Sequence, residues 1–150
     1  MDAPRLVASM FGIGRSPLAP GTVASLVALP VGAALLAWHP LVLAVAILAI
    51  TLLGLWSLHA GAIDGDPAWV VIDEVAGQWV ALITLAAPTL PGLLAAFALF
   101  RLFDIAKPGP VRLAERVRGA GGIMADDLVA GALAALVLLA AHWFAPGLIG

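Results

Sequence analysis

Five long apolar stretches constrain this chain more than any other feature of its sequence. They run from about Thr22 to Trp38, Leu41 to Leu58, Trp69 to Ala87, Leu90 to Ile105 and Leu128 to Phe144. Each is near the roughly 17–25 apolar residues that a helix needs to cross a bilayer. Hydrophobic residues make up 63% of the chain, so a soluble fold of 150 residues would expose large apolar patches to water. We therefore expect an all-α, polytopic integral membrane bundle of about five membrane-embedded helices, forming one domain over residues 1–150.

The composition also excludes several classes of function. The net charge is -2, which provides no general basic field for nucleic acid, so we expect no nucleic-acid partner. The chain has no cysteine, which excludes disulfides, thiolate zinc sites and a cysteine nucleophile. The segment from Met1 to Arg15 has neither a long apolar core nor a small-residue cleavage site, so we expect no signal peptide.

The charged residues predict an orientation in the membrane. With five crossings, the segment before the first apolar stretch and the segment between the fourth and fifth lie on the same side. These two segments carry the basic residues Arg5, Arg15, Lys107, Arg112, Arg116 and Arg118. The positive-inside rule then places the N-terminus and this basic side in the cytoplasm. The same side receives the acidic residues Asp64, Asp66, Asp73, Glu74, Asp104, Asp126 and Asp127.

Two acidic pairs stand at the predicted starts of apolar stretches, each with a glycine one turn further on. They are Asp73-Glu74 with Gly77, and Asp126-Asp127 with Gly131. Carboxylates at the start of a membrane helix are costly unless they are paired or bind metal. A simple interaction with the helix dipole is the alternative, but the repeated arrangement favours function. Gln78 lies one turn after Glu74 and could hold its carboxylate in place.

A charged stripe ends the fourth apolar stretch. Arg101, Asp104 and Lys107 recur at every third position, which places them along one side of a helix. Such a stripe could hold a metal-bridged phosphate. A structural ion pair, with Lys107 extending to the interface, is an equally good interpretation from these residues alone.

The loop before the first stretch is a second candidate for phosphate binding. Its sequence, GIGRSPLAPGT, contains Arg15, Ser16 and Gly21, and Thr22 is suited to cap the following helix. The free amides of a helix N-terminus can bind phosphate oxygens. An ordinary capped helix start is the alternative.

The acidic residues have no matching set of histidine or cysteine ligands, and oxygen ligands of this kind suit Mg²⁺. We therefore expect Mg²⁺ as cofactor and hypothesise that Asp73, Glu74 and Asp127 coordinate it. Arg101 and Lys107, with Arg15, would neutralise the charge of a bound phosphate.

Four sequence blocks, in this order, resemble the phosphatidylglycerophosphatase A family: GIGRSPLAPGT, IDEVAGQW, FRLFDIAKPGPV and GGIMADDLVAG. The resemblance implies a Mg²⁺-dependent enzyme of the bacterial inner membrane. It would remove the terminal phosphate of phosphatidylglycerophosphate to give phosphatidylglycerol. The resemblance also implies an active site containing Thr22, Asp73, Glu74, Asp104, Lys107, Asp126 and Asp127. Asp66 matches a polar family position in the least similar block.

Other interpretations are possible from the sequence. A small proton- or cation-coupled transporter would use the same acids, but we would expect them at several membrane depths rather than at one face. A CDP-alcohol phosphotransferase would show a long aspartate motif on adjacent turns, which is absent. The sequence leaves open a metal-activated water or an aspartyl-phosphate intermediate on Asp73, Asp126 or Asp127. The number of metal ions and the oligomeric state are also left open.

Overall fold

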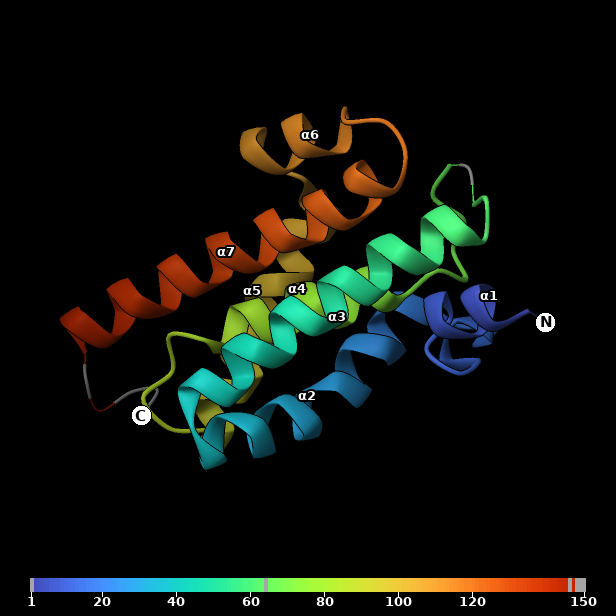
Figure 1. Ribbon diagram of the computed structural model, residues 1–150. Coiled ribbons are helices and arrows are strands. Elements are labelled where there is room, and N and C mark those ends of the chain that lie inside the picture. The colour runs from blue at the N-terminus through green and yellow to red at the C-terminus, as the bar shows by residue number, and fades with distance from the viewer. Residues whose placement is uncertain (1, 64, 146, 148–150) are drawn as a thin grey trace.

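A computed structural model describes residues 2–63, 65–145 and 147 of the chain. Over these residues the protein is helical throughout, with no strand, which confirms the predicted all-α class (Figure 1). The elements are α1 (Ala3–Ala8), the 3-10 turn η1 (Ile13–Arg15), α2 (Pro20–Trp38), α3 (Pro40–Ala60), α4 (Ile72–Leu82), α5 (Leu90–Ala106), α6 (Gly109–Glu115) and α7 (Ala120–Phe144).

The short helix α4 lies at the centre of the bundle. It packs against α2, α3, α5 and α7, and nine of its 11 residues are buried. Gly21 and Gly32 of α2 face Glu74 and Leu82 of α4, so these two helices run in the same direction. α7 also runs alongside α4 in that direction, since Gly131 faces Gly77 while Thr84 bonds to Ala135. This parallel packing brings the starts of α2 and α4 together with the first turns of α7.

The predicted third membrane span is wrong in its extent. The apolar stretch from Trp69 to Ala87 forms a helix only over Ile72–Leu82. At about 1.5 Å per residue, 11 residues are too short to cross a hydrocarbon core of roughly 30 Å. Because α4 is surrounded by other helices rather than lipid, the chain can leave the helix early without exposing backbone groups to hydrocarbon.

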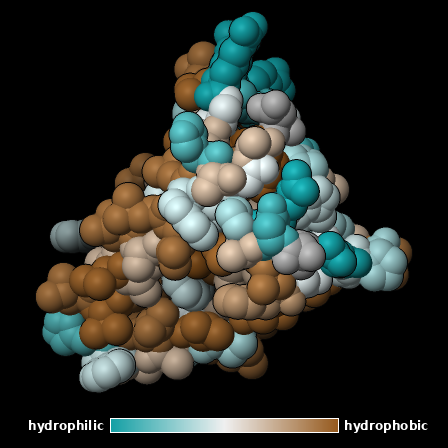
Figure 2. Space-filling view, turned by 45° about the vertical axis from the view of Figure 1, so that its right-hand side comes forward, coloured by the Kyte–Doolittle hydropathy of each residue, from teal (hydrophilic) through white to brown (hydrophobic). Residues whose placement is uncertain are grey.

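Three helices among the described residues are long and apolar enough to span a membrane: α2, α3 and α7. The expected number of about five membrane-embedded helices is therefore not confirmed. Many large apolar side chains on these helices point outward, among them Leu48 at 60% and Leu136 at 60% exposure. Figure 2 shows one broad apolar area, with hydrophilic residues gathered toward the top and right of the view. An apolar surface of this kind suits a lipid environment.

The predicted polar connection between the fourth and fifth stretches is also partly wrong. α7 begins at Ala120, about two turns earlier than the predicted start at Leu128, and α6 occupies residues 109–115. Asp126 and Asp127 consequently lie inside α7 rather than at its start. Their burial among protein groups, not in lipid, allows the helix to continue through them.

Candidate active site

Three carboxylates meet where α4 and α7 pack together. Asp73 and Glu74 occupy the first turn of α4, and Asp127 comes from the third turn of α7. One oxygen from each lies within 4.8 Å of the others. Asp73 and Asp127 are only 5% and 4% exposed. We call these three residues the acidic cluster.

Glycines allow the two helices to approach closely enough for the acidic cluster to form. A Cβ atom at Gly77 would lie 2.5 Å from the backbone oxygen of Asp127, and one at Gly131 would collide with the backbone oxygen of Gly77. These two glycines therefore sit at a close contact between α4 and α7. This contact places the backbone of Asp127 directly against α4.

Buried polar atoms without a hydrogen-bond partner are concentrated at this site. Within the described part of the chain, the cluster contributes Asp73 Oδ1, Glu74 Oε2 and Asp127 Oδ2. Native proteins rarely leave buried oxygens unpartnered, and three carboxylates this close repel one another unless a cation or protons intervene. The donor set contains only oxygen, which suits a hard divalent cation such as Mg²⁺. The residues present therefore fit the expected cofactor.

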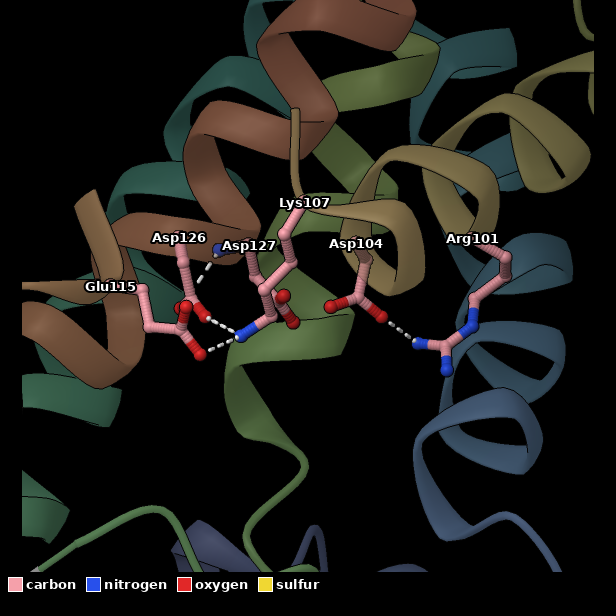
Figure 3. A network of polar contacts seen from close by, with 6 residues as sticks. All are labelled: Arg101, Asp104, Lys107, Glu115, Asp126 and Asp127. Atoms are coloured by element: carbon pink, nitrogen blue, oxygen red, sulfur yellow. Dashed lines mark hydrogen bonds and ion pairs between the residues drawn. The ribbon is translucent and has the colours of Figure 1, made fainter. Parts of the chain in front are cut away.

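Lys107 links the carboxylates of α6 and α7, as Figure 3 shows. Its Nζ lies 2.6 Å from Glu115 Oε1 and 2.9 Å from Asp126 Oδ2. Lys107 ends α5 in a left-handed conformation, with φ of 45°, which turns its side chain away from the helix. Partial burial works against its charge, but the bonds to Glu115 and Asp126 prevail and raise the pKa of Lys107 well above its ordinary value.

Arg101 and Asp104 form a separate ion pair on α5. Arg101 Nη1 lies 2.6 Å from Asp104 Oδ2, and both side chains are mostly buried. Asp104 also interacts electrostatically with Asp127 and Glu74, so this pair borders the acidic cluster. The predicted stripe is therefore divided. Arg101 and Asp104 stay on the helix, while Lys107 joins Asp126 (Figure 3).

The start of α2 reaches the acidic cluster through Gly21. Its Cα faces the carboxylate of Glu74 so closely that a Cβ atom would collide with it. Thr22 follows on the same turn, but the predicted N-cap role is wrong, because the helix begins at Pro20 with Ala19 as N-cap. The prolyl ring fixes a helical φ at that first position, which moves the helix start upstream.

Arg15 and Ser16 lie in the loop that precedes α2. Arg15 is exposed in η1. The Ser16 hydroxyl donates to the Leu18 carbonyl at 3.0 Å, within its own loop.

A pocket of about 350 Å³ lies beside Asp126. Asp66 and Asp126 line it together with Arg116 and Arg118 from the connection between α6 and α7. Loss of surrounding water and the charge of Asp126 raise the pKa of Asp66. This places Asp66 near the site, whereas Asp64 lies outside the described residues.

Two residues near the site differ from what the sequence predicts. Glu115 binds Lys107 only because α6 folds back toward α7, and no local sequence pattern predicts that α6 packs there. Gln78 was expected only to hold Glu74, yet both of its amide atoms are buried without a partner. The signal available for Gln78 was its place, one turn after an acidic pair in a helix buried on all sides.

Comparison with known proteins gives a consistent result. The family model described as phosphatidylglycerophosphatase A matches residues 6–142. The chain is 38% identical to phosphatidylglycerophosphatase A of Escherichia coli strain K12, over 92% of this chain and 84% of that protein. It is 35% identical to the protein of that name from Haemophilus influenzae, over 93% and 88%.

Another relative carries a different name. A Bacteroides thetaiotaomicron protein named "Putative phosphatidylinositol-3-phosphatase" is 37% identical, over 93% of this chain and 94% of its own length. No solved structure matches the chain at a significant level.

Proposed function

The chain belongs to the phosphatidylglycerophosphatase A family, and from this membership we propose Mg²⁺-dependent hydrolysis of the terminal phosphomonoester of phosphatidylglycerophosphate. The products are phosphatidylglycerol and inorganic phosphate. Membership itself makes the protein a lipid phosphatase. The observation that carries the proposal is the acidic cluster, in which three carboxylates from two helices each keep a buried oxygen without a partner.

Asp73, Glu74 and Asp127 are the proposed metal ligands. Mg²⁺ commonly binds through a few carboxylates together with water and substrate phosphate. When bound, the cation supplies charge neutralisation and polarisation of the phosphate. The protein contributes a buried, oxygen-only site whose spacing depends on the contact between Gly77 and Gly131.

Arg101 and Lys107 are the proposed cationic partners of the substrate phosphate, since both carry charge beside the acidic cluster. Asp104 and Asp126 hold these two cations in place. Gly21 and Thr22 would add the free amides of the α2 N-terminus. Arg15 and Ser16, in the loop before α2, are further proposed contacts of the phosphate.

The arrangement favours water over Asp126 as the nucleophile. Asp126 Oδ2 binds Lys107, and Asp126 Oδ1 accepts the backbone N–H of Asp127 at 3.1 Å. Both oxygens are therefore occupied. In the proposed reaction, the water oxygen bonds to phosphorus and the bond from phosphorus to the ester oxygen breaks. One water proton ends on the lipid hydroxyl and the other stays on the phosphate.

We also propose a location in the bacterial inner membrane, with the acidic cluster on the cytoplasmic side. The support is the distribution of basic residues, together with the three apolar helices. The lipid acyl chains would remain in the bilayer while the headgroup reaches the polar end of the bundle. A transporter is not favoured, because the matched family and the relatives above are named as lipid phosphatases.

The test is phosphate release by the purified protein in detergent micelles. Phosphatidylglycerophosphate would be assayed with Mg²⁺ or EDTA, beside phosphatidylinositol 3-phosphate and phosphatidic acid. We expect Mg²⁺-dependent turnover with phosphatidylglycerophosphate as the preferred substrate. If phosphatidylinositol 3-phosphate is the preferred substrate, the proposed activity would be wrong, and the protein would instead have the activity for which the Bacteroides relative is named. Absence of turnover on all three lipids by folded protein would refute the proposal.

A further inference from the structure

Gln78 is the most unusual buried residue that the proposed mechanism does not use. Its side chain is 0% exposed, and neither its amide nitrogen nor its amide oxygen has a hydrogen-bond partner among the described residues. Leaving a buried amide unpaired is unfavourable, and an apolar side chain of similar shape would avoid that loss. Packing alone therefore does not explain why a glutamine occupies this position.

Several other buried polar side chains of the bundle are satisfied. The Ser25 hydroxyl donates to the Gly21 carbonyl at 2.8 Å, and the Ser57 hydroxyl donates to the Gly54 carbonyl at 2.9 Å. Trp79, the next residue after Gln78, donates its indole N–H to the Ala28 carbonyl at 2.9 Å. The unpartnered buried atoms in the described part of the chain belong to Asp73, Glu74, Gln78, Arg101 and Asp127. Gln78 thus shares its unsatisfied state with the site and not with the core.

Gln78 lies on the same face of α4 as Glu74. Gln78 lies one turn after Glu74, and side chains of a helix lean toward its N-terminus. Gln78 and Glu74 therefore share one face of α4, and Glu74 Oε2 is also unpartnered. Gly77, its neighbour, contacts the backbone of Asp127 on α7. A small polar ligand between Gln78 and Glu74 would satisfy atoms of both residues.

We propose that the Gln78 amide binds an oxygen atom of the reacting species, either the hydrolytic water or a phosphoryl oxygen. This inference rests on the proposed phosphatase function. A water can donate to Gln78 Oε1 and to the free oxygen of Glu74, which fixes the direction of its lone pair. A phosphoryl oxygen can instead accept from Gln78 Nε2. Both ligands share the chemistry of a polar oxygen within hydrogen-bond reach of the amide.

Replacement of Gln78 by methionine tests the proposal, with Thr84→Val as a matched control. Thr84 lies just past the end of α4, and its hydroxyl donates a hydrogen bond to the Ala135 carbonyl of α7 at 2.9 Å. Both variants would be measured for apparent Tm in EDTA and for kcat and KM. For Gln78→Met we expect an unchanged or higher Tm and strongly impaired turnover. For Thr84→Val we expect a lower Tm and unchanged turnover.

The kinetic constants identify the ligand. A kcat reduced by about 100-fold with KM within about twofold indicates the water, since small misplacement of a reacting group costs this much. A KM raised about tenfold indicates the phosphoryl oxygen. Kinetics of Gln78→Met within about twofold of wild type, or a Tm that falls together with activity, would overturn the assignment.

A binding measurement separates this inference from the proposed function. Inorganic phosphate with Mg²⁺ should raise the Tm of the wild-type protein by occupying the site. If wild type shows no turnover, the proposed function fails while the phosphate shift can still be compared. In that case, a smaller phosphate-induced rise of Tm in Gln78→Met than in wild type supports phosphate binding by Gln78. An equal rise of Tm in the two proteins refutes phosphate binding by Gln78.

Discussion

Both ends of α4 are buried, but the polar groups at its start lack hydrogen-bond partners, whereas those toward its end have them. At the first turn, Asp73 and Glu74 retain oxygens without partners, and Gln78 does so one turn later. Toward the other end, Trp79 donates to α2, and Thr84, just past the helix, donates to α7. Burial is therefore not what distinguishes the two ends. Unsatisfied polar groups in a native protein point to a ligand, and here they gather on the first turns of α4 and on the α5 and α7 residues Arg101 and Asp127.

This contrast has an energetic consequence. The satisfied end ties α4 to α2 and α7 and contributes to folding. The unsatisfied end opposes folding until a ligand neutralises the carboxylates, so ligand binding should stabilise the protein. Substitutions at the two ends should then change activity and stability in opposite patterns.

The largest effect is expected for Asp127→Asn. Loss of one proposed metal ligand should reduce turnover by about 10³-fold, because metal and phosphate would no longer be held together. Removal of one of three neighbouring charges should leave the apparent Tm in EDTA unchanged or higher. The stabilisation by Mg²⁺ should disappear. Phosphate release and thermal unfolding with and without Mg²⁺ measure these outcomes, and wild-type turnover in the variant would end the metal assignment.

The second largest loss of turnover is expected for Lys107→Met. This change leaves Asp126 and Glu115 near each other without their shared cation, and we expect turnover to fall by about 10²-fold. Arg112→Met, on α6 and exposed, is the control and should remain active. A variant that matches the control would show that Lys107 is only structural.

The raised pKa of Lys107 adds a pH prediction with a defined sign. A raised folded-state pKa means that the stabilisation is complete below the ordinary lysine value and is lost only as pH rises through the higher one. Wild-type protein should therefore keep this ion-pair network from pH 7 to pH 9. Thermal unfolding over that range would test it, and a Tm difference between wild type and Lys107→Met that shrinks by pH 9 would contradict it.

The acidic residues at the start of α4 could be predicted from the sequence, but the position where the helix ends could not. The acidic residues that meet at the cluster could be anticipated, because buried acids beside spaced glycines are unusual in apolar segments. The length of α4 could not, since apolar residues 83–87 look the same whether they continue a helix or fill a gap against α7. Asp126 and Asp127 looked like the start of a helix because the fifth apolar stretch begins directly after them, at Leu128. Their actual environment is set by Lys107 and by the helix contact at Gly77, which are tertiary features.

The helix contact itself is the third target, through Gly131→Ala. The added methyl group would press on the carbonyl of Gly77 and force α4 and α7 apart. Overpacking of this kind costs about 3 kcal/mol at the upper end of its usual range. Gly121→Ala is the control, because open space surrounds that position. Denaturant unfolding in detergent should show a large loss for Gly131→Ala alone, and equal stabilities would refute the close approach.

The smallest effect, and the sharpest contrast with Gln78, is expected for Trp79→Phe. The two residues are adjacent and both buried, but the Trp79 indole has a partner, the Ala28 carbonyl. Loss of that bond should lower the free energy of unfolding by about 1 kcal/mol. Turnover should remain within about twofold of wild type, because the indole points toward α2 and away from the acidic cluster. If Trp79→Phe instead lost activity while keeping its stability, the division of α4 into a structural end and a functional end would be wrong.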